Sequence, residues 1–180
     1  MKARYYLFFS VLLAGTAFSG SAGTVADLDP ELKEALLRDD ACMKNTVGSA
    51  ISSMGSPVSV QELLTGGHEA GVVAAPQDSC HCRGRNCLTY VYLKASDDYK
   101  LALQGSFASL KPMKVVKNGL PSLSGKVQVS DAAEETTVYD WTGREYQASL
   151  CATVSMGKNQ RLPKITRHPC KTGAARGVLE

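Results

Sequence analysis

The stretch Leu88-Thr89-Tyr90-Val91-Tyr92-Leu93-Lys94-Ala95 predicts a β-strand, because β-branched and aromatic residues alternate in its part Thr89-Tyr90-Val91-Tyr92. A similar alternation occurs in Lys126-Val127-Gln128-Val129-Ser130. Turn residues such as Ser96-Asp97-Asp98 and Asn118-Gly119 separate the candidate strands. We place these strands at 71–75, 88–95, 99–103, 113–116, 126–130, 136–141 and 145–154. Because the connections are short, we expect neighbouring strands to pair antiparallel.

A helix is predicted upstream of the strands, beginning at Asp29-Pro30-Glu31, because Asp can cap a helix and Pro suits its first turn. Apolar residues at near-helical spacing extend it to about Asn45. Residues 58–64 fit either a short helix or a strand. We therefore predict an α+β fold in which this N-terminal helix packs on a curled, mainly antiparallel β-sheet stabilised by disulfides.

The first 22 residues have the organisation of a secretory signal peptide. Lys2 and Arg4 precede an apolar run at 5–18, and the small residues that follow favour cleavage after Ala22, with Ser19 and Ala26 as alternative positions. The apolar run is short for a bilayer span, which takes about 20 residues. We expect a periplasmic or secreted protein without stable membrane insertion.

The rest of the chain divides by charge into a body at 23–155 and a tail at 156–180. The body holds 12 Lys/Arg and 16 Asp/Glu, whereas the tail holds six Lys/Arg and the single acid Glu180. The body has the length of a single α+β domain with its own core. A solvated terminus explains the basic tail, and attraction to an anionic surface is the alternative. An acidic body does not favour nucleic-acid binding.

All six cysteines lie after the predicted signal peptide, and an even number in an exported chain predicts three disulfides. Fifteen pairings are formally open. We favour Cys82 with Cys87, Cys151 with Cys170, and Cys42 with Cys80. The competing interpretation is a metal site in which Cys80-His81-Cys82 acts with Cys87, His68 and His168. No second two-ligand motif is present, so we expect neither a metal nor another cofactor.

The sequence matches none of the catalytic motifs considered, so we name no catalytic residue. The chain has no Gly-x-Ser-x-Gly motif. The stretch from Gly119 to Lys126 departs from a phosphate-binding loop in both spacing and its final residue. Three carboxylate pairs, at 39–40, 97–98 and 134–135, fit solvated turns better than a glycosidase or calcium site.

One extended segment resembles a recurring element of small Gram-negative periplasmic proteins. It runs from Cys82-Arg83-Gly84-Arg85-Asn86-Cys87 into the strand that ends at Leu93. Tyr99-Lys100-Leu101 and Gly119-Leu120-Pro121-Ser122-Leu123 resemble later parts of the same element, so that the resemblance covers residues 68–151. In those proteins a Cys-Gly-x-Gly-x-Cys-like loop leads into the strand, and some of them resemble periplasmic lysozyme inhibitors and immunity proteins.

The resemblance implies an exported binding protein, an inhibitor or immunity factor that acts on a cell-wall hydrolase or toxin. We expect Arg83 and Arg85 to contact this protein partner, because guanidinium groups bind carboxylates bidentately. Two alternatives stay open: a secreted enzyme that uses carboxylates or an unpaired Cys and His, and an envelope-associated structural protein that binds through its basic tail.

Overall fold

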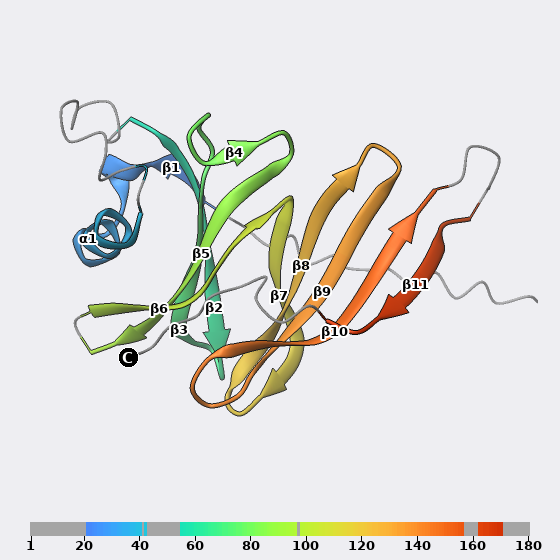
Figure 1. Cartoon of the computed structure of the whole chain (residues 1–180). Coiled ribbons are helices and arrows are strands. Elements are labelled where there is room, and N and C mark those ends of the chain that lie inside the picture. Colours follow the sequence, from blue (N-terminus) through green and yellow to red (C-terminus); the bar gives the residue numbers. More distant parts are fainter. Residues whose placement is uncertain (1–20, 41, 43–54, 97, 157–161, 171–180) are drawn as a thin grey trace, which may run out of the picture.

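The computed structural model describes residues 21–40, 42, 55–96, 98–156 and 162–170 (Figure 1). Strands make up 67% of these residues and helices 11%, and the strands form two antiparallel sheets. The predicted α+β fold, with a helix packed on one curled sheet, is therefore wrong, and the protein is mostly β. The alternating pattern located most strands, but it could not show that the chain leaves one sheet at Ala108 and begins a second.

The first sheet contains the strands that precede this crossing: β1 (Ser21–Thr24), β2 (Pro57–Thr65), β3 (His68–Pro76), β4 (Cys82–Arg83), β5 (Asn86–Ala95) and β6 (Asp98–Phe107). β1 pairs with β2 and β2 with β3, while β3, the short β4 and β6 all pair with β5. The ambiguous segment 58–64 lies in β2. β1 spans the predicted cleavage position after Ala22, and residues 1–20 of the predicted signal peptide lie outside the described ranges.

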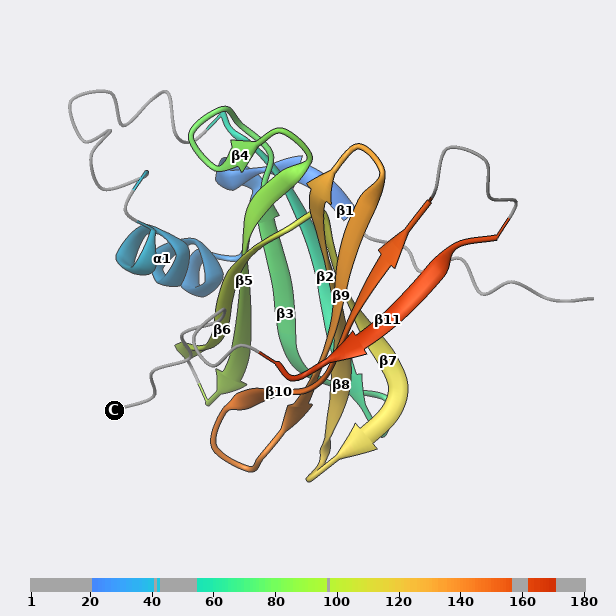
Figure 2. The same ribbon diagram turned by 45° about the vertical axis from the view of Figure 1, so that its right-hand side comes forward.

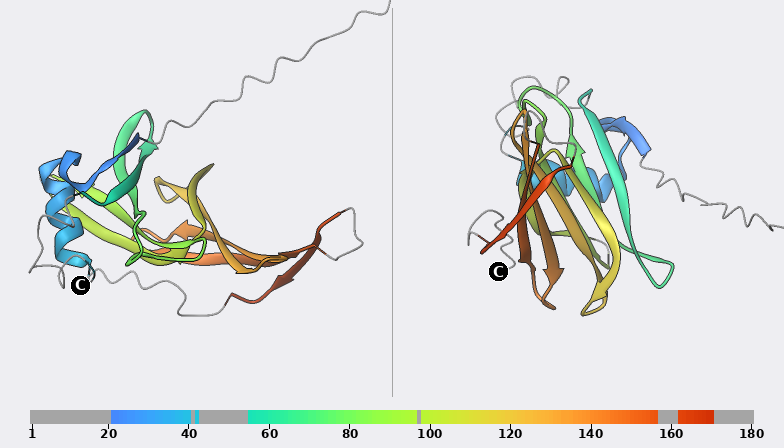
Figure 3. Two further views of the ribbon diagram at one scale, coloured as in Figure 1. Left: turned by 90° about the horizontal axis from the view of Figure 1, so that it is seen from above. Right: turned by 90° about the vertical axis from the view of Figure 1, so that its right-hand side faces the viewer.

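The second sheet contains β7 (Ser109–Lys117), β8 (Leu120–Ser130), β9 (Ala133–Trp141), β10 (Tyr146–Ser155) and β11 (Lys164–His168), each paired with its neighbours in sequence. Seen from above, β10 and β11 extend beyond the first sheet (Figure 3, left). β11 lies in the tail at 156–180, where the sequence pattern predicted no regular element. The tail residues 157–161 and 171–180 lie outside the described ranges.

Both faces of the first sheet are buried, which explains the apolar character of β5. Tyr90 and Tyr92 belong to a core cluster that they share with α1 (Pro30–Asp39). Val91, which points to the opposite face, belongs to a second cluster with Leu123 and Tyr139 of the second sheet. Figure 1 accordingly shows α1 on the side of the first sheet that faces away from the second.

The helix begins where the sequence predicted. The Asp29 side chain accepts hydrogen bonds from the backbone N–H groups of Glu31 and Leu32, at 3.0 and 3.4 Å. A short 3-10 helix (Val25–Asp27) precedes α1. α1 ends at Asp39, and residues 41 and 43–45 of the longer predicted helix lie outside the described ranges. Within the described part of the chain, none of the helices has the length and apolar character that a membrane crossing requires.

Three disulfides join the predicted partners. Cys42 is bonded to Cys80, Cys82 to Cys87, and Cys151 to Cys170. The first ties the segment after α1 to the loop between β3 and β4, the second closes the hairpin of β4 and β5, and the third fastens the end of the described tail to β10. Each bridge contributes on the order of 2–4 kcal/mol by restricting the unfolded chain.

Candidate functional site

The hairpin of β4 and β5 is fixed by its own turn. Arg83 pairs with Asn86, and the two residues between them, Gly84 and Arg85, make the reversal. Gly84 has a φ of +62°, a left-handed conformation that glycine adopts without a steric penalty. The paired positions of Cys82 and Cys87 carry the disulfide, so this short hairpin is closed covalently.

Asn86 also fastens the hairpin to the second sheet. Its side-chain N–H donates to the Gln128 carbonyl at 2.9 Å, and its side-chain oxygen accepts from the Gln128 N–H at 2.8 Å. Figure 2 shows the hairpin at the end of the molecule where the turn between β8 and β9 lies. The position of the hairpin is thus set by both sheets.

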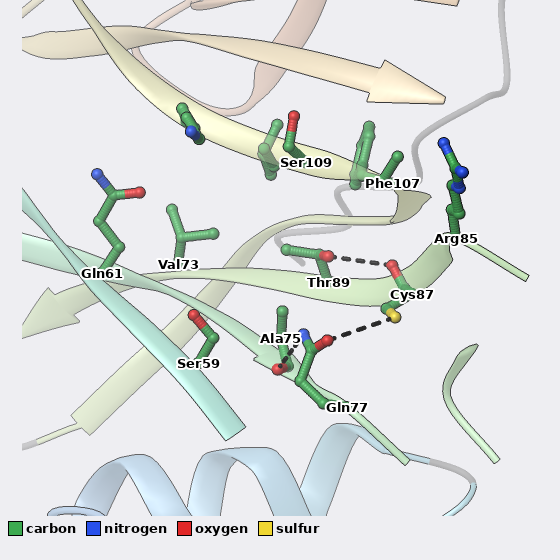
Figure 4. Close-up of a pocket in the computed structure, with 13 residues that line it drawn as sticks. Ser59, Gln61, Val73, Ala75, Gln77, Arg85, Cys87, Thr89, Phe107 and Ser109 are labelled. Carbon is green, nitrogen blue, oxygen red and sulfur yellow. Dashed lines mark hydrogen bonds between the residues drawn. The ribbon is translucent and has the colours of Figure 1, made fainter. Parts of the chain in front are cut away.

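A pocket of about 220 Å³ lies beside this hairpin, between the two sheets (Figure 4). β2, β3 and β5 form one wall, and the crossing from β6 into β7 forms the other. Its lining combines apolar side chains with hydroxyl and amide groups: Ser59, Gln61, Val73, Ala75, Gln77, Arg85, Cys87, Thr89, Phe107, Ala108, Ser109, Leu110 and Lys111.

The charges of the pocket are all positive, because Arg85 and Lys111 are the charged residues among its described lining. Some polar groups are already engaged. Gln77 donates its side-chain N–H to the Ala75 carbonyl at 3.0 Å, and the Thr89 hydroxyl donates to the Cys87 carbonyl at 3.1 Å. Two cations beside a partly apolar surface favour an anionic group that carries some apolar surface of its own.

The two predicted contact residues differ in their surroundings. Arg85 lines the pocket, whereas Arg83 lies immediately before the turn and is not among the lining residues. Both arginines are exposed. Sequence reasoning missed Lys111 and the side chains of β2 and β3. Their distance along the chain from Arg85 left no local pattern by which to associate them.

A second group of polar side chains is buried at the end of α1. His81 Nε2 lies 2.6 Å from Asp40 Oδ2, and His81 Nδ1 lies 2.5 Å from Asp78 Oδ1. The Asp40 and His81 side chains are 0% and 2% exposed. Burial opposes ionisation of Asp78, but hydrogen bonds from His81 and Ser56 hold the pKa of its carboxyl below the usual value.

This buried group shows that the prediction for the carboxylate pair 39–40 was wrong, and it contains only one of the three histidines. Asp40 is not part of a solvated turn, since it is the buried C-cap residue of α1 and contacts a histidine 41 positions away. His68 lies at the start of β3. His168 lies on β11, with its Nε2 3.3 Å from the Thr153 hydroxyl. The three histidines are therefore not combined into one site.

The fold and the site together define a disulfide-bonded protein of two packed β-sheets with a basic pocket between them. The chain matches no known family model, and no curated protein or solved structure is significantly similar to it.

Proposed function

We propose that this chain is an exported binding protein that captures a carboxylate of a protein partner in the pocket between its sheets. The observation that carries the proposal is the position of Arg85, which lines a pocket with Lys111 and stands on a hairpin closed by a disulfide. A disulfide-closed hairpin lowers the entropic cost of binding, because the backbone that carries Arg85 is already fixed. Arg85 can meet a carboxylate with two parallel hydrogen bonds.

The size of the pocket favours a side chain over a free cofactor. Sites for drug-sized ligands usually enclose about 300–1,000 Å³, and this pocket holds about 220 Å³. An Asp or Glu side chain would place its carboxylate near Arg85 and its methylene groups beside Phe107, which lies next to Arg85 in the pocket (Figure 4). Arg83, exposed on the same hairpin, would contact the partner outside the pocket.

A cell-wall hydrolase is the partner class that we propose, which makes the chain a periplasmic inhibitor or immunity factor. Many glycoside hydrolases hold a pair of carboxylates in an open cleft, and the exposed Arg83 and Arg85 of the hairpin carry the opposite charge. The predicted signal peptide and the three disulfides suit an oxidising compartment outside the cytoplasm.

The test is binding and inhibition of a panel of purified wall hydrolases, with a lysozyme as the first probe. The panel is titrated with residues 23–180 by calorimetry. We expect Arg85→Ala to weaken binding about 10- to 100-fold, the range for loss of a charge-assisted hydrogen bond. Arg83→Ala should have a smaller effect. Lys100→Ala, at an exposed position on β6 outside the pocket lining, is the matched control.

Two results would contradict the proposal. One is the absence of binding to every hydrolase in the panel. The other is equal affinity of the wild-type chain, Arg85→Ala and Lys111→Ala for a hydrolase that does bind, which would locate the contact elsewhere.

A further inference from the structure

The buried polar group at the end of α1 has the composition of a metal site. Ligand atoms of Asp40, Cys42 and His81 all lie within 4.8 Å of one another. We propose that, when the Cys42–Cys80 disulfide is reduced, these three residues bind a Zn²⁺ ion. The Cys80 sulfur, which is bonded to the Cys42 sulfur in the oxidised chain, would supply the fourth ligand.

The orientation of His81 is the independent observation that points to a metal. Histidines that bind metals usually donate their other ring N–H to a carboxylate, which fixes the ring and its tautomer. Asp78 occupies this position at His81 Nδ1, 2.5 Å away, so that Nε2 faces Asp40. Asp78 is itself held by the backbone N–H groups of Cys80, at 2.9 Å, and His81, at 3.1 Å.

The donor set selects the class of metal. An imidazole nitrogen, a carboxylate oxygen and one or two thiolates suit Zn²⁺, which is bound in tetrahedral sites at about 2.0–2.3 Å. Mg²⁺ and Ca²⁺ prefer oxygen ligands alone. Asp40 is positioned before any metal arrives, because one of its oxygens accepts the Cys42 N–H at 2.8 Å while the other contacts His81.

Metal and disulfide exclude each other at this site. A dithiol reductant supplies two electrons, the bond between the Cys42 and Cys80 sulfurs breaks, two thiols form and the reductant becomes a disulfide. Zn²⁺ then displaces the thiol protons and the proton between His81 Nε2 and Asp40. A disulfide oxidant reverses the exchange: it accepts two electrons from the two thiolates, the bond between their sulfurs re-forms and Zn²⁺ is released.

Either state joins the same two parts of the chain. Cys42 and Asp40 follow α1, whereas His81 and Cys80 lie between β3 and β4. The metal would therefore hold these segments together in a chain whose cysteines are still reduced, before the disulfide replaces it.

The experiment uses the full mature chain, residues 23–180, reduced with a phosphine, desalted without oxygen and titrated with Zn²⁺ against a chromogenic chelator. We expect one tightly bound Zn²⁺ per reduced chain and none in the oxidised chain. His81→Gln should abolish the tight site, and Asp78→Asn should weaken it by about 10- to 100-fold. His168→Gln is the matched control, because this partly exposed histidine lies beside the Cys151–Cys170 disulfide.

X-ray absorption at the zinc edge identifies the atoms that coordinate Zn²⁺ in the reduced wild-type chain. This measurement does not depend on whether a variant folds. A shell with one or two sulfurs and two or more nitrogen or oxygen atoms supports the proposal. An all-sulfur shell, no tight binding by the reduced chain, or an unchanged affinity in His81→Gln would each overturn it.

Discussion

Alkaline pH should unfold this protein in one cooperative step, with its buried tyrosines ionising together. Of the seven tyrosines, Tyr5 and Tyr6 lie in the predicted signal peptide, and the other five are all buried. Burial raises the pKa of each of these five phenols above the ordinary value of 10.0. For Tyr90 the negative charge of Asp40 adds to this effect. The folded chain therefore keeps protons that the unfolded chain loses.

The sign and size of the effect follow from that difference. A raised folded pKa contributes stability that is fully present below pH 10 and is lost as the pH rises. Tyr90 and Tyr92 are both 0% exposed. If each ionises only on unfolding, each removes about 1.4 kcal/mol of stability at pH 11 and about 2.7 kcal/mol at pH 12. Together they remove about 5 kcal/mol at pH 12, comparable with the whole stability of a small domain.

Phenolate absorbance and circular dichroism, recorded on the same samples, test this prediction. We expect both to change together at about pH 11–12 and to return when the pH is lowered promptly. Tyr90→Phe is an informative variant, because it removes the buried Tyr90 hydroxyl, which lies close to the negative charge of Asp40. It should raise the alkaline midpoint, because one buried group that ionises on unfolding is removed. Gradual ionisation near pH 10 with an unchanged dichroism spectrum would refute the reasoning.

Three substitutions test the packing and the hairpin. Gly125→Ala would place a Cβ 2.8 Å from a ring carbon of Phe107, so we expect a loss of about 1–3 kcal/mol in urea unfolding. Gly71→Ala, whose Cβ would meet backbone atoms of β5, should cost more than Gly125→Ala in the same assay, and an equal or smaller loss would contradict the close approach of β3 and β5. Asn86→Ala removes both hydrogen bonds to Gln128 and should lower stability by about 1–3 kcal/mol and accelerate exchange of the Gln128 amide hydrogen. Unchanged exchange would mean that this contact does not hold the hairpin.

The local parts of the fold were readable from the sequence because short-range patterns encode them. The predicted strand at 88–95 lies within β5, and the predicted strand at 136–141 lies within β9. Asp29 caps α1 as its position before Pro30 predicted. The three disulfides join the cysteines that were predicted to pair. The pair in the hairpin was the easiest to predict, because Cys82 and Cys87 are only five positions apart in the sequence.

Long-range relations were not readable in the same way. Alternation shows which side chains share a face, but it does not show which strands are neighbours, so a single curled sheet was predicted in place of two. β11 escaped prediction because its residues are mostly exposed and lack an alternating apolar pattern. Of the two charged residues that line the pocket, the sequence indicated Arg85, which lies in the cysteine loop, but not Lys111, which lines the pocket from the second sheet. Asp40 and His81 are likewise brought together only by the completed fold.

The order of the strands bears on how the protein is made. Every strand of the first sheet lies at or before Phe107, and every strand of the second lies after it. The first sheet can therefore form without any strand of the second. Until the second sheet packs on it, the face with Val73 and Val91 stays uncovered, and a chain truncated at Ala108 would expose an apolar surface that favours aggregation.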